Sequence, residues 1–193
     1  MKKLFLITGA SGIGKTTISR EIATRIENCA IIDGDILYHM EHTTKTPAED
    51  LEAGAKRLKL VFKNATMLIN NFLENDLNVV FEYIIFPNDL RYILEHIKKN
   101  DNLIIKFIIM TGNEQTIIDR NLSREKNNLN RGLELLDILN SFNYNSKFYI
   151  DTTNLDILET AKMIIDNDKY TIYGGTQWKK GKWKHCYMIG ITI

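Results

Sequence analysis

The chain has 193 residues and a mass of 22.3 kDa, which suits one domain whose core is large enough to fold without disulfides. Its 44% hydrophobic and 25% charged residues exclude a disordered chain, a collagen-like repeat and a polytopic membrane protein. Since 25 basic and 24 acidic residues leave a net charge of +1, we expect neither nucleic acid nor a membrane as partner. Two cysteines without metal-binding spacing, and a first apolar run confined to residues 4–7, predict a cytoplasmic protein.

Short apolar runs alternate along the chain with longer amphipathic stretches. We expect strands over residues 3–8, 30–32, 78–81, 103–110 and 147–150, and helices over 17–27, 48–75, 89–99, 113–124, 132–142 and 155–165. This order predicts a three-layer α/β sandwich over residues 1–169, with a five-stranded, mainly parallel sheet and helices on both faces. Ligands of such sheets bind beyond the carboxyl ends of the strands, so the residues that follow each strand matter most.

The segment after the first strand, residues 9–16, fits the GxxxxGK[ST] pattern of a phosphate-binding loop, or P-loop. The glycines permit a tight turn whose backbone N–H groups point at a phosphate chain, and the following helix directs its positive N-terminus to the same anion. Lys15 would reach the β- and γ-phosphates, and the Thr16 hydroxyl would bind Mg²⁺. The residues expected to bind the nucleotide are Gly9, Ala10, Ser11, Gly12, Ile13, Gly14, Lys15, Thr16 and Thr17.

Acidic residues follow the second and third strands. Asp35 is the candidate to accept a proton from, or orient, a substrate hydroxyl, and Asp33 would hold Mg²⁺ through a water molecule. Glu82 ends the third strand, where a carboxylate either holds Mg²⁺ through water or binds the substrate. Because no NKxD-type base-reading motif of GTPases occurs late in the chain, the sequence favours ATP and the small kinases.

Several of these segments resemble the gluconate and shikimate kinase-like group of P-loop kinases, and bacterial gluconate-kinase-like proteins in particular. Residues 33–35 (Asp-Gly-Asp) resemble the Asp-x-Asp element of that group. Arg120 and Arg124, four residues apart before a polar stretch, resemble the start of a nucleotide-kinase lid. Residues 151–154 resemble the adenine-side loop, and residues 34–40 and 83–87 resemble patterns of the gluconate-kinase-like proteins.

The resemblance implies a P-loop NTPase fold, Mg-ATP as cofactor, and transfer of the γ-phosphate to a hydroxyl of a small molecule such as a sugar acid. It implies a lid over about residues 120–132, in which Arg120 and Arg124 neutralise the transferred phosphate, or an Arg120 that stacks on adenine, with Asn154 near the nucleotide. The expected acceptor-binding residues are Asp35, Tyr38, His39, Glu82, Tyr83 and Arg131. Gluconate kinases tend to have a His-Pro pair soon after the second Asp, and residues 37–40 lack proline, so the resemblance does not specify gluconate.

Two other functions fit the same residues. The chain could be a nucleoside, nucleotide or toxin-like kinase, because Asp119 and Arg120 resemble the acid–Arg pairs of some nucleoside kinases. It could also be a nucleotide-gated binding module without catalysis, acting through a C-terminal extension of residues 170–193. That extension holds Trp178 and Trp183 among lysines, a pattern that favours a β-hairpin packed on the domain over a single-strand RNA contact.

Overall fold

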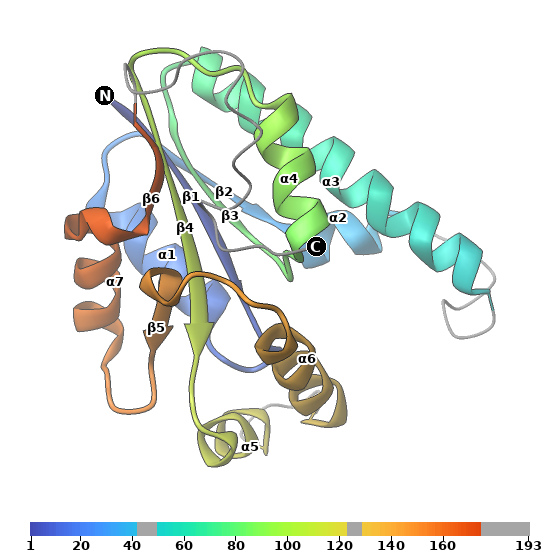
Figure 1. The fold of residues 1–193 in the computed structure, drawn as a ribbon. Helices are drawn as coiled ribbons and strands as arrows, with labels where there is room; N and C mark the ends of the chain where they lie inside the picture. Colours follow the sequence, from blue (N-terminus) through green and yellow to red (C-terminus); the bar gives the residue numbers. More distant parts are fainter. Residues whose placement is uncertain (42–49, 123–128, 175–193) are drawn as a thin grey trace.

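The computed structural model describes residues 1–41, 50–122 and 129–174 (Figure 1). The described strands are β1 (Lys2–Gly9), β2 (Cys29–Asp33), β3 (Asn78–Glu82), β4 (Leu103–Thr111), β5 (Tyr149–Asp151) and β6 (Thr171–Gly174). The described α-helices are α1 (Lys15–Arg25), α2 (Gly34–His39), α3 (Leu51–Glu74), α4 (Pro87–His96), α5 (Glu114–Leu122), α6 (Leu129–Ser141) and α7 (Ile157–Asp166). Two 3₁₀ turns, η1 (Ser146–Phe148) and η2 (Asp168–Tyr170), precede β5 and β6. None of the described helices is long and apolar enough to cross a lipid bilayer.

Five strands form one parallel sheet in the order β2-β3-β1-β4-β5, which confirms the predicted architecture. A sixth strand, β6, runs antiparallel to β4. β5 and β6 pair with different parts of β4, since β5 lies beside Ile109–Thr111 and β6 beside Ile104–Lys106. The carboxyl ends of the parallel strands share one edge of the sheet, from which the chain continues into α1, α2 and α5.

Alternate side chains of the central strand β1 divide the core into two layers. The helices α3 and α4 pack on one face of the sheet, and α1 and α7 cover the other (Figure 1). Leu4 and Leu6 belong to the core layer with α3 and α4, whereas Phe5 and Ile7 belong to the layer with α1 and α7. This division arises because successive side chains of a strand point to opposite faces. The buried α3 residues in the first layer are Val61, Phe62, Ala65, Ile69 and Leu73, at the three- and four-residue spacing of one helical face. The sheet is therefore covered on both faces.

Two departures from the sequence analysis have local causes. Residues 34–39, for which we predicted no element, form α2 because the Asp33 side chain caps it, accepting hydrogen bonds from the amides of Asp35 (2.8 Å) and Ile36 (3.3 Å). The predicted start of the fifth strand was wrong. Residues 146–148 form η1 instead, because the Asn145 side chain accepts a hydrogen bond from the Lys147 amide at 3.0 Å.

The C-terminal extension is described only at its start, where residues 171–174 form β6. The hairpin predicted around Trp178 and Trp183 lies outside the described residues. The division of the chain at residue 170 therefore stays a prediction.

A buried lysine joins the sheet to the last α-helix. Lys106 of β4 is 2% exposed, and its ammonium donates to the carbonyls of Ile164 (3.3 Å), Ile165 (2.7 Å) and Asn167 (3.1 Å). These carbonyls lie at the end of α7, where a helix leaves acceptors without intrahelical partners and carries partial negative charge. Burial lowers the pKa of Lys106, and the carboxylate of Asp168, 3.9 Å away, opposes that shift. Lys106 thus caps α7 from within the core.

Candidate active site

The turn between β1 and α1 has the backbone conformation of a phosphate-binding loop. Gly12 and Gly14 adopt φ values of +88° and +103°, which residues with a Cβ rarely adopt. The Lys15 ammonium turns back over the loop and donates to the carbonyls of Gly9 (3.0 Å) and Ala10 (3.2 Å). Because α1 begins at Lys15, its positive N-terminus faces the same turn. The backbone at the carboxyl end of the central strand therefore has a conformation that suits an anion.

Arg120, near the end of α5, ties this loop to the segment that follows β5. One guanidinium nitrogen, Nη1, donates to the Ile13 carbonyl (2.8 Å) and to Thr152 Oγ1 (3.2 Å), while Nη2 donates to the Thr152 carbonyl (3.1 Å). Burial lowers the pKa of Arg120. An arginine ordinarily titrates so far above neutral pH that the group stays charged. Three hydrogen bonds thus fix the plane of the guanidinium group beside the P-loop.

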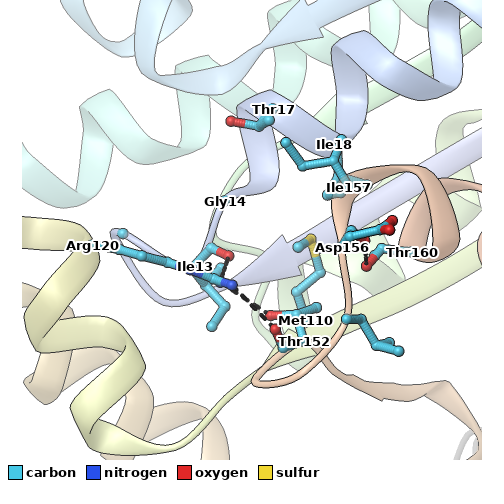
Figure 2. Close-up of a pocket in the computed structure, with 12 residues that line it drawn as sticks. Ile13, Gly14, Thr17, Ile18, Met110, Arg120, Thr152, Asp156, Ile157 and Thr160 are labelled. Carbon is cyan, nitrogen blue, oxygen red and sulfur yellow. Dashed lines mark hydrogen bonds between the residues drawn. The ribbon is translucent and has the colours of Figure 1, made fainter.

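A cavity of about 320 Å³ lies beside Arg120, a volume in the range of small-molecule sites. Figure 2 shows it between the P-loop, the start of α1 and the N-terminal turn of α7. Apolar side chains of Ile18, Met110, Leu155 and Ile157 line it together with the polar groups of Arg120, Thr152 and Asp156. Thr17, predicted to bind the nucleotide, also lines this cavity, whereas Asn154 is exposed between two lining residues, Thr152 and Leu155. A flat, partly apolar ring next to bound phosphates would fit here.

Glu82 is a buried carboxylate next to the P-loop. It ends β3 in register with Ile7 of β1 and Asp33 of β2, and it is 3% exposed. Burial raises the pKa of Glu82, and a hydrogen bond with Thr16 and the charge of Lys15 oppose that shift. Its Oε1 atom has no hydrogen-bond partner among the described residues. An ionised oxygen buried in this way is costly unless a positive charge or a donor reaches it.

The oxygen atoms at this edge of the sheet suit a hard divalent cation. The Thr16 hydroxyl, the Glu82 carboxylate and the Asp33 carboxylate come from three neighbouring segments, and the charges of Asp33 and Asp35 both reach Glu82. Oxygen ligands, several of them water or phosphate, are what Mg²⁺ prefers. In the part of the chain that the structure describes, no three His, Cys, Asp or Glu side chains form a complete metal cage. A phosphate chain and water would therefore have to supply some of the ligands of a cation at this place.

The second expected group of residues lies on α2. Asp35 is exposed in the first turn of this helix, two residues beyond Asp33. Tyr38 is half-buried, and the ring of the exposed His39 meets its ring edge-on at 5.3 Å between centroids. The structure brings Asp35 to the Glu82 edge of the sheet, and it places Tyr38 and His39 later on the same helix. Their roles stay predictions.

Two more expected residues lie at the end of β3 and near the start of α6. Tyr83 is 6% exposed and packs in the core, with its ring 5.8 Å from that of Phe62. Arg131 is exposed at the start of α6 and forms an ion pair with Glu134 at 2.6 Å. Arg124 lies outside the described residues. The contact of Tyr83 and Arg131 with a substrate therefore stays a prediction.

The sequence analysis missed two residues that hold the site together. Arg57 of α3 places its guanidinium 4.2 Å from the Tyr38 ring centroid and donates from Nε to the Tyr38 carbonyl at 2.8 Å. Asn121, fully buried on α5, donates from Nδ2 to the carbonyls of Ser11 (3.3 Å) and Ile117 (2.9 Å). Neither belongs to a sequence pattern. Only its position next to Arg120 could have directed attention to Asn121.

No protein-family model and no curated protein sequence matches the chain. Solved structures do match. A sugar kinase from Janibacter sp. HTCC2649 is 14% identical with a TM-score of 0.58, over 86% of this chain and 95% of that one. A gluconokinase from Sinorhizobium meliloti 1021 is 16% identical with a TM-score of 0.52, over 83% of this chain and 87% of that one.

A third similar structure is the Deinococcus radiodurans tunicamycin resistance protein, at 13% identity and a TM-score of 0.57, over 85% of this chain and 94% of that one. The likeness spans nearly the whole length of all three structures. The chain therefore shares its fold with a sugar kinase and a gluconokinase, as the resemblance in its sequence implied.

Proposed function

We propose that this protein is an ATP-dependent phosphotransferase that moves the γ-phosphate of Mg-ATP to a hydroxyl of a small molecule. The observation that carries the proposal is the buried Glu82 carboxylate, which lies against Thr16 and Lys15 of a P-loop with two left-handed glycines. A structural turn needs neither a buried acid nor a lysine at that place. The kinase fold of the similar structures supports the same conclusion.

The nucleotide would lie across the carboxyl ends of β1, β4 and β5. Its phosphates would occupy the P-loop, where the backbone amides and Lys15 supply positive charge. Its base would enter the cavity beside Arg120, whose hydrogen bonds to Ile13 and Thr152 hold a planar cation ready to stack on a ring. In this arrangement Arg120 would stack on the adenine ring of the nucleotide. Neutralisation of the transferred phosphate in a closing lid would then depend on other residues.

The residues present fit a magnesium ion. Thr16 would bind it directly, and Glu82 and Asp33 would hold it through water, which would give the orphaned Glu82 oxygen a partner. When bound, Mg²⁺ neutralises charge on the β- and γ-phosphates. Lys15 adds a second positive charge at the same phosphates, and the two charges together favour transfer of the terminal group.

Asp35 would act on the acceptor. Its carboxylate accepts the proton of the substrate hydroxyl as the hydroxyl oxygen forms a bond to the γ-phosphorus. The bond between that phosphorus and the β,γ-bridging oxygen breaks, and ADP leaves with its electron pair. The Asp33 cap fixes the first turn of α2 and therefore the position of Asp35. Tyr38, His39 and Arg131 would line the acceptor side, as proposed from the sequence.

The proposal is tested by ATP turnover with Mg²⁺ across sugar acids, neutral sugars and polyols, nucleosides and aminoglycosides. Transfer to one acceptor well above hydrolysis by water is expected, and the preferred acceptor separates a sugar-type kinase from a nucleoside kinase. Asp35→Asn should lower transfer at least about 100-fold and leave ATP affinity within about twofold. Asp101→Asn, at an exposed aspartate outside the site, is the matched control.

One result would overturn the proposal, and another would correct the role of one residue in it. ATP binding without transfer to any acceptor would favour the alternative of a nucleotide-gated binding module. Unchanged transfer by Asp35→Asn would remove Asp35 as the base and leave the phosphotransferase activity standing.

A further inference from the structure

Two consecutive residues of α5 hold two carbonyls of the P-loop from the outside. Arg120 donates to the Ile13 carbonyl at 2.8 Å, and Asn121 donates to the Ser11 carbonyl at 3.3 Å. The residue between these carbonyls is Gly12, whose φ of +88° permits the loop to turn there. The helix therefore contacts alternate peptide units of the loop.

These contacts decide where the loop directs its amides. In a planar trans peptide, the carbonyl of one residue and the N–H of the next point in opposite directions. A hydrogen bond from Asn121 to the Ser11 carbonyl therefore turns the Gly12 amide away from α5. The bond from Arg120 to the Ile13 carbonyl does the same for Gly14. Backbone amides directed to the same side of a turn can bind one anion together.

Asn121 is packed tightly against the loop. A Cβ atom added at Gly12 would overlap Nδ2 of Asn121, and a Cβ added at Gly132 of α6 would lie 2.8 Å from the Ser11 carbonyl oxygen and 3.3 Å from Nδ2. Asn121, Gly12 and Gly132 thus fit together around one carbonyl oxygen. A displacement of any of the three would move Ser11.

The chemistry of Asn121 argues against a role in packing alone. The side chain is fully buried, and its Oδ1 atom has no hydrogen-bond partner among the described residues. A buried amide with one unsatisfied oxygen costs stability, and an apolar side chain of similar size would avoid that cost. What an apolar side chain would not supply is the Nδ2 donor to Ser11.

We propose that Asn121 is a positioning residue for phosphate binding, which acts through the Ser11 carbonyl to keep the Gly12 amide directed at the phosphate chain. The inference rests on the proposed nucleotide site. It predicts an effect on ligands that carry phosphates and none on the bare nucleoside, because adenosine would occupy only the cavity beside Arg120. A residue that merely stabilised α5 would affect both ligands alike.

The test is calorimetric titration of the full chain with ATP and with adenosine. For Asn121→Ala we expect ATP affinity to fall about tenfold while adenosine affinity stays within about twofold. Ile117→Val is the matched control, since it trims a buried side chain one turn earlier on α5 and leaves the bond to Ser11 intact. The control should keep the wild-type ratio of ATP to adenosine affinity.

Equal losses for both ligands, or no loss for either, would overturn the inference. A wild-type chain that binds ATP no better than adenosine would overturn the proposed function itself, and that result needs no variant. If Asn121→Ala does not fold, Gly132→Ala provides the same test, because its methyl group would press on the Ser11 carbonyl while alanine favours the helix. A selective loss of ATP affinity is expected there too, and an unchanged affinity ratio would contradict the inference.

Discussion

Gly34 lies directly against Tyr83, and a Cβ atom added at position 34 would lie 2.6 Å from the Cβ of that tyrosine. The contact joins the first residue of α2 to the residue after β3, so it sets how closely Asp33 and Asp35 approach Glu82. The closeness of the two segments, more than the conformation of the glycine, requires the absence of a side chain at position 34.

Replacement of Gly34 by alanine should therefore disturb the chemistry more than nucleotide binding. The added methyl group has to move the start of α2, and Asp35 moves with it, while the P-loop and the cavity beside Arg120 lie on other segments. We expect kcat to fall at least about tenfold with ATP affinity near that of the wild type. Steady-state kinetics and titration of ATP measure the two quantities, and a variant with wild-type kcat would contradict the prediction.

Glu82→Gln should stabilise the unliganded protein and weaken its response to Mg-ATP. The pKa of Glu82 is raised by burial, so the folded state binds this proton more tightly than the unfolded state. Its contribution to stability is present below the unfolded pKa of about 4.5 and is lost as pH rises through the higher folded value, above which an unfavourable buried charge remains. Thermal unfolding with and without Mg-ATP measures both effects.

The exposed Glu95→Gln provides the control for that experiment, because it removes the same charge from α4 outside the site. A Glu82→Gln variant whose melting temperature rises with Mg-ATP as much as that of the wild type would show that Glu82 does not serve the metal.

Asp89→Asn should flatten the pH dependence of stability below neutral pH. Burial raises the pKa of Asp89 from 3.8 to about 6, although its carboxylate accepts a hydrogen bond from the Phe86 amide at 3.0 Å. The wild-type protein should therefore lose stability as pH rises from about 4 to about 6. Asparagine keeps the acceptor for Phe86 and should stabilise the protein at pH 7 by at most about 3 kcal/mol.

Denaturant unfolding at several pH values measures this effect. The exposed Asp137→Asn should retain the wild-type profile. An Asp89→Asn variant with the same profile as the wild type would contradict the assignment.

Lys106→Met should destabilise the protein by about 2–4 kcal/mol, although methionine is the more hydrophobic side chain. The substitution leaves the carbonyls of Ile164, Ile165 and Asn167 without their buried donor. Lys162→Met, at an exposed position of α7, should change the free energy of unfolding by no more than about 0.5 kcal/mol. Chemical denaturation measures both, and equal stability of the two variants would show that the carbonyls find other partners.

The sequence predicted most of the fold and the glycine-rich turn of the candidate site, because both depend on local pattern. The apolar runs predicted the five parallel strands, and the spacing of Gly9, Gly14 and Lys15 predicted the P-loop. It did not predict α2, because an Asp-Gly pair also favours turns and only the Asp33 cap decides between the two. Asn121 and Arg57 were missed for a different reason. Their roles depend on which carbonyls lie next to them in the folded chain, and no spacing along the sequence encodes that.

The antiparallel strand β6 and the buried ammonium of Lys106 have a consequence for the order of events during synthesis. When the chain has emerged from the ribosome as far as β4, β1 and β3 are available to pair. At that stage β4 still has an unpaired edge at Ile104–Lys106, and the carbonyls that accept hydrogen bonds from Lys106 have not yet been synthesised. Among the described residues, the strand partner of this edge and the acceptors of Lys106 all lie within residues 164–174. A nascent chain therefore closes its central strand late, and until then it exposes the kind of unpaired edge that chaperones must shield.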